Sequence, residues 1–167
     1  MDALDILSEA ALRPLQAAQQ LRAHLTAEVL NGHVNDHPNS VAWLLWHIGR
    51  EIDIQTATLT GGEEVWTRGG FNNRLNLGEV GATLGYGHTP EEARAIRTDD
   101  ADGLLEYLEA ATEALVHYIN SLDEDELDHV VDQSWDPPVT CGVRLISIID
   151  DAAQHVGQAA YVVGALR

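Results

Sequence analysis

The chain has 167 residues, 45% of them hydrophobic and 22% charged, which is the balance of a globular protein rather than of a disordered segment. All nine basic residues are arginine, and 27 acidic residues bring the net charge to −18. This charge disfavours binding to nucleic acid and to anionic membranes, and the absence of lysine excludes a Walker-type phosphate loop and a Schiff-base lysine.

Chain length and cysteine content set further limits. The length favours one domain over residues 1–167. The single cysteine, Cys141, excludes an intramolecular disulfide and a cysteine-based structural zinc site. The acidic N-terminus lacks the features of a secretion signal, and no apolar run approaches the ~18 residues of a membrane span. We therefore expect a soluble cytoplasmic protein.

The first third of the chain predicts two long helices. Apolar residues recur every three or four positions from residue 2 to about 24, and Pro14 within this pattern predicts a kink or a break. After a turn-forming segment, a second helix is expected from the N-cap residue Ser40 to about residue 59, where a glycine pair ends it.

The rest of the chain predicts a glycine-rich connection and two more long helices. Residues 61–89 hold eight of the fourteen glycines and show little periodicity. Thr89 caps a short helix, a clean apolar stripe predicts a third long helix over about 100–122, and Thr140 caps a fourth that runs to the C-terminus. No segment alternates convincingly like a strand. These patterns predict an all-α fold, a four-helix bundle with a long glycine-rich connection between the second and third helices.

The last predicted helix carries an acid and a histidine in positions suited to metal binding. On a helical wheel Asp151 and His155 lie at the edge of the apolar stripe, and their spacing of four residues places both side chains on one face. A buried carboxylate without a partner is costly, so an arginine, a hydrogen-bond network or a metal must compensate Asp151. His47 also borders the apolar side of its helix and is the natural third ligand. Glu51, one turn later, is a rival or a supporting partner.

The same residues also have an ordinary interpretation. A histidine near an apolar face is commonly a hydrogen-bonded core residue, and an Asp-x-x-x-His pair is commonly a buried hydrogen bond or salt link. His33 and His37 share the spacing of four, but Pro38 follows them in a loop, which disfavours a second metal site. Three ligands with two nitrogens and one oxygen would leave a coordination position open, and Zn²⁺ fits them best, with Ni²⁺ or Fe²⁺ as alternatives.

Several separated stretches together resemble the DinB-like superfamily. They are HPNSVAWLLWHIGREID, GYGHTPEE, WDPPVTCGVRL and DDAAQHVGQAAYVVG, within residues 35–167. The sequence is most similar to the DUF664-type actinobacterial branch, whose relatives include mycothiol-dependent maleylpyruvate isomerase and bacillithiol S-transferases.

This resemblance implies a DinB-like four-helix bundle with a divalent metal held by three side chains. His47 matches a histidine of the second helix, and His155 matches the last position of an H-x-x-x-H pair. Asp151 stands where most members have histidine, although the maleylpyruvate isomerases carry a carboxylate there. The enzymes of the superfamily use low-molecular-weight thiols, and the lack of lysine, a habit of GC-rich genomes, points to an actinobacterium with mycothiol as the thiol.

The glycine-rich segment is expected to complete the pocket. Its candidate substrate contacts are Trp66, Arg68, Arg74, Tyr86 and His88. An arginine would suit a carboxylate on the electrophile or on the thiol. Alternatively, the aromatic side chains pack the loop and the arginines offset nearby acids.

Three functions stay open. The first is a thiol-dependent S-transferase or isomerase in which a metal held by His47, Asp151 and His155 activates a thiol for attack on an electrophile. The second is a hydrolase that uses metal-bound water, and the third is a non-catalytic binding protein with a vestigial site. The maleylpyruvate isomerases usually carry an additional C-terminal domain, so we expect a different reaction for a chain that ends at Arg167. Exposed apolar edges could support a homodimer.

Overall fold

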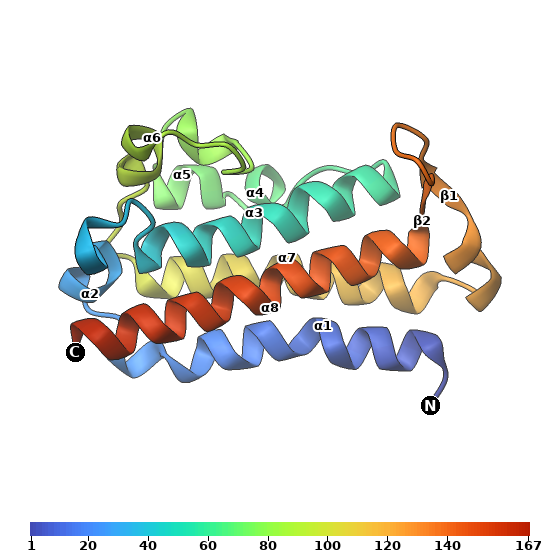
Figure 1. The fold of residues 1–167 in the computed structure, drawn as a ribbon, viewed down its shortest axis with the longest axis horizontal. Coiled ribbons are helices and arrows are strands. Elements are labelled where there is room, and N and C mark those ends of the chain that lie inside the picture. Colours follow the sequence, from blue (N-terminus) through green and yellow to red (C-terminus); the bar gives the residue numbers. More distant parts are fainter.

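Four long helices lie side by side along the length of the molecule (Figure 1). The computed structural model describes all residues from Met1 to Arg167. The long helices are α1 (Ala3–Gln20), α3 (Val41–Thr60), α7 (Ala101–Ser121) and α8 (Cys141–Leu166). The prediction of a predominantly helical chain is confirmed. None of the helices combines the length and the apolar character that a bilayer-spanning segment requires.

Shorter elements connect the long helices. They are η1 (Arg22–His24), α2 (Ala27–Asn31), η2 (Val34–Asp36), α4 (Val65–Arg68), α5 (Phe71–Leu75), η3 (Val80–Ala82), α6 (Pro90–Ala95), η4 (Glu124–Asp128), β1 (Val130–Asp132) and β2 (Val139–Thr140). The elements α4 to α6 lie over one side of α3, and the β1–β2 hairpin stands at the opposite end of the molecule from the C-terminus (Figure 1).

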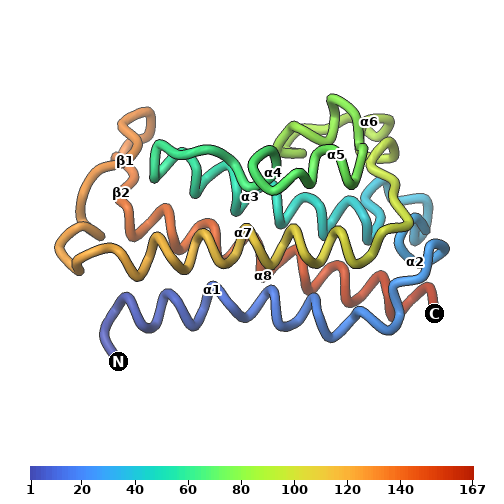
Figure 2. The backbone as a smooth tube through the Cα atoms, turned by 180° about the vertical axis from the view of Figure 1, so that it is seen from behind, coloured from blue at the N-terminus to red at the C-terminus, as the bar shows by residue number.

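The long helices pack in a fixed set of pairs. Helix α3 packs against α7 and α8, and α1 packs against the same two helices, so that α1 and α3 lie diagonally across the core. Figure 2 shows this arrangement from behind, with α7 between α3 and α1. The apolar stripes predicted from the sequence meet along these contacts and form one continuous hydrophobic core. The pairing of α3 with α8 brings residues from distant parts of the chain together.

Local capping chemistry sets the ends of α3, α6 and α8 as predicted. The Ser40 hydroxyl accepts from the backbone N–H of Trp43 at 3.1 Å, and Gly61 ends α3 with φ at 67°. Thr89 and Glu92 form a capping box at α6, and Thr140 caps α8. Pro14 does not break α1, which runs through it from Ala3 to Gln20.

A two-stranded hairpin is the one element type that the sequence did not predict. Val130 pairs with Thr140 and Asp132 with Val139 in antiparallel order. The strands have only three and two residues, which is too short for an alternating pattern to emerge. The prediction that no segment forms a strand is wrong at this point, and the hairpin leads directly into the N-terminus of α8.

Candidate metal centre

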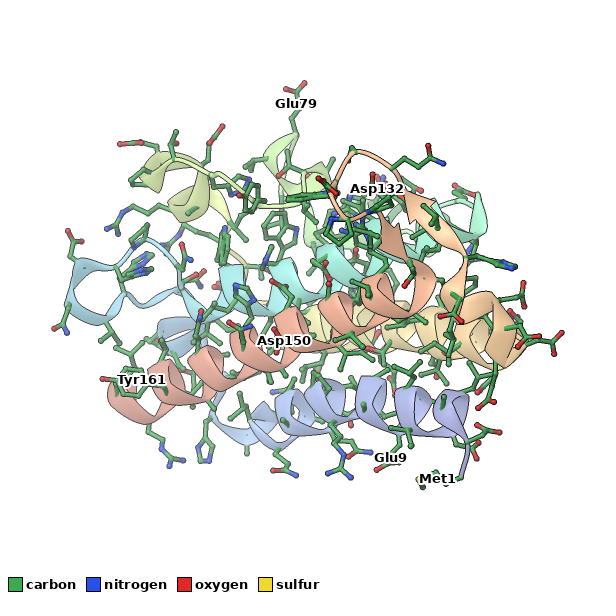
Figure 3. All side chains as sticks on the ribbon, turned by 45° about the vertical axis from the view of Figure 1, so that its right-hand side comes forward. Met1, Glu9, Glu79, Asp132, Asp150 and Tyr161 are labelled. Carbon is green, nitrogen blue, oxygen red and sulfur yellow. The ribbon has the colours of Figure 1, made fainter.

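His47, Asp151 and His155 converge between α3 and α8. Each offers one donor atom, and the three atoms lie within 4.8 Å of one another. His47 is buried, whereas Asp151 and His155 are half-buried, with 3.6 Å between His47 Nε2 and Asp151 Oδ2. Figure 3 labels Asp150, the chain neighbour of Asp151, near the middle of α8. The cluster therefore lies near the middle of a helix pair.

Helix geometry explains why these residues meet. Asp151 and His155 are one turn apart on α8, so both side chains project from the same face. Helix α3 packs across this face of α8. Closer to the hairpin, Gln55 of α3 accepts a hydrogen bond from Arg144 of α8 at 2.8 Å. His47 lies two turns before Gln55, which places it opposite the Asp151–His155 pair.

Hydrogen bonds set the tautomer of both histidines. His47 Nδ1 lies 2.7 Å from the carbonyl oxygen of Leu84, and His155 Nδ1 lies 2.9 Å from that of Asp151. Because a carbonyl oxygen only accepts, each Nδ1 carries the hydrogen and each neutral ring keeps its lone pair on Nε2. A histidine that binds a metal commonly donates its other N–H in this way.

The Asp151 carboxylate indicates whether the cluster suits a metal ion. Its Oδ2 atom is buried and has no hydrogen-bond partner within the protein. A buried carboxylate oxygen without a partner is costly, and a cation held by this oxygen and the two Nε2 atoms would compensate it. Two imidazole nitrogens and one carboxylate oxygen form a donor set that Zn²⁺ accepts with ligand distances of about 2.0–2.2 Å. The residues present fit a divalent metal.

The surroundings shift the pKa values of the two histidines in opposite directions. Burial lowers the pKa of His47, and the nearby His155 lowers it further. The Asp151 carboxylate, 3.3 Å from Nδ1 of His155, raises the pKa of His155. His47 is therefore held in the neutral form that a metal requires. At acidic pH a proton competes with a metal for His155.

Donors on α3 hold four consecutive carbonyl groups of the connection. Trp46 Nε1 donates to Gly81 O at 3.1 Å, and His47 Nδ1 donates to Leu84 O at 2.7 Å. Between them Arg50 donates to Ala82 O at 2.8 Å and to Thr83 O at 3.1 Å. We call residues 81–84 the carbonyl clamp. It fixes the acceptor that orients His47.

Gly85 closes the carbonyl clamp at a point where a side chain has no room. Its φ is +91°, and a Cβ atom would lie 2.9 Å from His47 Nδ1 and 2.9 Å from the Trp46 ring. Gly85→Ala is expected to destabilise the protein by about 1–3 kcal/mol and to weaken Zn²⁺ binding about tenfold or more, because His47 must shift. Chemical denaturation of protein freed of metal by a chelator measures the loss of stability, and titration with Zn²⁺ measures the loss of affinity.

Gly87 offers a matched control for this substitution. It also has a positive φ of +77°, but no atom lies within 4 Å of an added Cβ. Gly87→Ala should therefore share only the backbone cost and should leave Zn²⁺ affinity unchanged. Equal Zn²⁺ affinity in both variants would show that His47 does not depend on the space beside Gly85.

Glu51 is a buried acid beside the three donors. It lies one turn after His47 on α3, and its Oε2 atom has no hydrogen-bond partner. Burial, and then repulsion from Asp151, raises the pKa of Glu51 to about 8. The side chain is therefore protonated at neutral pH in the absence of a cation, and a cation nearby would favour its ionised form.

Glu51→Gln is expected to make stability less dependent on pH. Folded metal-free protein keeps the Glu51 proton up to a pKa of about 8 against an ordinary 4.5, so unfolding releases it and the free energy of unfolding falls as pH rises from about 5 to 8. Glutamine stays neutral, so the variant should equal the wild type near pH 4.5 and exceed it by on the order of 3 kcal/mol at pH 8. Denaturant titrations with a chelator present test this.

An exposed acid provides the control for the pH experiment. Glu109 lies on α7 in contact with solvent, and Glu109→Gln should leave the slope of stability against pH unchanged. A wild-type stability that stays flat between pH 5 and 8 would contradict the buried, protonated state of Glu51.

The five residues predicted to contact substrate do not form one group. Trp66 is buried beneath Arg50, whose guanidinium carbon lies 5.2 Å from its ring centroid. Arg74 is ion-paired with Asp100 and Glu106. Arg68 lines a separate cavity of about 590 Å³ between α3 and α7, and the side chain of Tyr86 is 91% exposed.

His88 is the member of that set that lies near the cluster. Its Nδ1 accepts from Trp43 Nε1 at 3.2 Å, and its ring stacks on Trp46 with 5.6 Å between centroids. Trp43 in turn stacks on His47 at 4.7 Å. His88 therefore supports the rings that hold His47 in place.

Two cavities flank the cluster along the α3–α8 pair. One, of about 660 Å³, extends toward the C-terminal end of α8, where Gln158 and Val162 follow His155 by one and two turns. The other, of about 350 Å³, lies toward the hairpin and is lined by Gln55 and Arg144 among others. Neither cavity was identified from the sequence, because their walls combine loop residues with helix residues that are distant in the chain.

Comparison with known families gives a direct match over most of the chain. A family model described as mycothiol-S-transferase matches residues 58–166. The chain belongs to the mycothiol-S-transferase family, a DinB-like family. The resemblance inferred from the sequence motifs is confirmed.

A solved structure extends the similarity of this mycothiol-S-transferase family member to the whole chain. The crystal structure of a conserved protein from Enterococcus faecalis is 33% identical, with a TM-score of 0.91 over 99% of this chain and 98% of that one. No curated protein matches the sequence significantly. The family match begins at Thr58, so it contains Asp151 and His155 but not His47, which α3 brings to them.

Proposed function

We propose that this protein is a metal-dependent S-transferase that joins a low-molecular-weight thiol, mycothiol in the first instance, to an electrophilic small molecule. The observation that carries the proposal is the convergence of His47, Asp151 and His155, in which the Asp151 carboxylate has a buried oxygen without a hydrogen-bond partner. Family membership supports a thiol as one of the two substrates. We also propose that the four long helices form a DinB-like four-helix bundle.

His47, Asp151 and His155 would hold the metal, with Zn²⁺ favoured and Ni²⁺ or Fe²⁺ as alternatives. A divalent ion at such a site lowers the pKa of a bound thiol and so supplies thiolate at neutral pH. In the reaction the thiol sulfur would lose its proton and form a bond to an electrophilic carbon. In a substitution a leaving group departs from that carbon with its electron pair, and in an addition the neighbouring atom of the former double bond takes up a proton.

The residues of this chain prepare the site in three ways. The carbonyl clamp holds the Nδ1 hydrogen of His47, so its Nε2 faces Asp151. The stacked rings of Trp43 and His47 exclude water from one side of the cluster. The cavity that Leu44 and Gln154 help to line begins within one turn of His47 and His155 and would admit a reactant beside the cluster.

The test begins with protein purified without a histidine tag. Zn²⁺- or Ni²⁺-loaded protein is mixed with mycothiol and a chromogenic aryl halide, and thioether formation is followed by absorbance and mass spectrometry. Product that requires metal, thiol and Asp151 supports the proposal. Thiol-independent hydrolysis of ester substrates would favour the hydrolase alternative. Failure to retain Zn²⁺ or Ni²⁺ would contradict the enzyme proposal and favour a binding protein with a vestigial site.

A further inference from the structure

The cavity that Arg68 lines lies on the side of α3 that faces α7, the side seen in Figure 2. Its volume of about 590 Å³ is in the range of small-molecule sites. One wall comes from α3 and the following 62–68 segment, and the other comes from α7. No residue of α8 lines it, so it is separate from Asp151 and His155. We call it the α3–α7 cavity.

The charged and titratable side chains that face the α3–α7 cavity differ in how they are bonded. They are Asp53, Glu63, Arg68, Glu113 and His117. Asp53 is satisfied, because it accepts from two backbone N–H groups, at 2.7 and 2.8 Å, and from the Tyr107 hydroxyl at 2.9 Å. Glu63 accepts from the Thr67 hydroxyl at 3.2 Å. The other three make no hydrogen bond or ion pair within the protein.

An arginine without an acidic partner is unusual in this protein. Acids outnumber arginines by 27 to nine, and most of the arginines are ion-paired. The exceptions are Arg68, Arg97 and Arg167. Of these, Arg68 lines the α3–α7 cavity, and Glu113 on the facing wall also has no partner of opposite charge. Two opposite charges therefore line one cavity without meeting.

The wall formed by α3 also carries a buried hydroxyl without a partner. Thr56 is only 4% exposed, and its Oγ1 atom makes no hydrogen bond. A threonine within a helix can donate to the carbonyl four residues earlier, as Thr60 does to Thr56 O at 3.0 Å. Because an unpaired buried hydroxyl is costly, a ligand group that accepts from Thr56 would recover free energy.

These features fit a ligand with two charged ends and a polar middle. An anionic group suits Arg68, a cationic group suits Glu113, and an oxygen that accepts a hydrogen bond suits Thr56. A ligand of this kind has no net charge, so the −18 charge of the protein does not repel it.

We propose that the α3–α7 cavity binds a short unblocked peptide, with its carboxylate on Arg68, its ammonium group on Glu113 and an amide oxygen on Thr56. An extended dipeptide is about 7 Å long, which lets one molecule meet groups from both walls. The rest of the lining includes small apolar side chains, which leave room for those of the peptide; they are Ala57, Val65, Ala110 and Ala114. The inference does not depend on the proposed transferase activity.

Titration of isotope-labelled full-length protein with L-alanyl-L-valine, followed by NMR, tests the proposal. The backbone signals of Thr56 and Ala114 should shift, whereas that of Gln158, beside another cavity, should not. Two capped forms of the dipeptide each lack one charge. N-acetyl-L-alanyl-L-valine has no ammonium group and L-alanyl-L-valine amide has no carboxylate, so each should bind about fivefold more weakly.

Substitutions in the protein assign the two ends of the peptide. In Arg68→Gln the penalty for the amide form should vanish and the penalty for the acetylated form should stay. In Glu113→Gln the reverse should hold. Arg97→Gln and Glu109→Gln are the matched controls, because they make the same changes of charge at exposed positions outside the cavity. Both penalties should persist in the controls.

Thr56→Val removes the buried hydroxyl and nearly keeps the shape of the side chain. It should weaken binding of the dipeptide severalfold and leave the free protein at least as stable as the wild type, because an unpaired hydroxyl is lost. A hydroxyl with a merely structural role would lower stability instead when removed.

Three results would overturn the inference. They are the absence of shifts at Thr56 and Ala114 at tens of millimolar dipeptide, equal affinity for the dipeptide and its capped forms, and penalties that persist in Arg68→Gln and Glu113→Gln. Because the cavity shares no residue with the cluster, binding of the dipeptide should be the same with Zn²⁺ and with a chelator. The result therefore stands apart from the outcome of the transferase assay.

Discussion

Replacing Asp151 by alanine is expected to lower the affinity for Zn²⁺ by more than about 100-fold, because it removes the only charged donor of the cluster and leaves two neutral imidazoles. A competition titration against a chromophoric chelator measures the loss, and elemental analysis gives the stoichiometry. We expect about one Zn²⁺ per chain in the wild type and none retained in Asp151→Ala or His47→Ala.

The neighbouring residue Asp150 provides a matched control. It has the same charge and lies on the same helix, but its side chain is exposed and bonded to Gln154. Asp150→Ala should keep Zn²⁺ affinity within about twofold. Metal-free Asp151→Ala should be at least as stable as the wild type, because it loses a buried oxygen without a partner and a negative neighbour of Glu51. Equal Zn²⁺ retention in both aspartate variants would contradict the assignment of Asp151 as a ligand.

Arg50→Met is expected to destabilise the protein by about 3–5 kcal/mol, the largest effect among the substitutions considered. The Arg50 side chain is only 1% exposed and is shared between the carbonyl clamp, Glu64 at 2.8 Å and the Tyr107 hydroxyl at 3.2 Å. Its loss leaves Asp53, itself 2% exposed, without its nearby cation. Equilibrium unfolding in urea, with a chelator present to remove metal, measures the change in the free energy of unfolding.

The size of this effect depends on burial rather than on the presence of an ion pair. Arg22 forms an ion pair with Asp102 in which both side chains are about half exposed. Arg22→Met should therefore destabilise the protein far less than Arg50→Met, because solvent screens an exposed ion pair. If the two arginine variants lost similar stability, the buried network around Arg50 would not be the support of the carbonyl clamp.

Local patterns were sufficient to predict the long helices and several of their ends. The stripe of α7 and the caps at Ser40, Thr89 and Thr140 depend on residues three or four positions apart, which interact within one helix. The hairpin at β1 and β2 was missed because its short strands are held by pairing across a loop rather than by their own pattern.

The cluster was predictable in part for the same reason. Asp151 and His155 share one helix face, so their proximity follows from spacing alone. Adding His47 depended on the resemblance to a family as well as on the helix pattern. The structure places all three together, and the metal itself stays a prediction.

The glycine-rich connection shows where the sequence falls short. Arg74 is paired with Asp100 and Glu106 from another part of the chain, and its role as a substrate contact stays a prediction. Trp66 is covered by Arg50 and Tyr107, which no local pattern relates to it. Contacts of this kind arise from tertiary packing, so neither the role of these residues nor the position of the flanking cavities follows from periodicity.

The pairing of α3 with α8 gives a bound ion a second role, that of a reversible cross-link. A cation held by His47 and Asp151 ties together positions about 100 residues apart in the chain. A covalent link that closes a loop of this length removes enough entropy from the unfolded chain to be worth about 4–5 kcal/mol. The ion would act as a removable staple between the second and the last of the long helices, and the resistance of this protein to heat would follow the concentration of free metal around it.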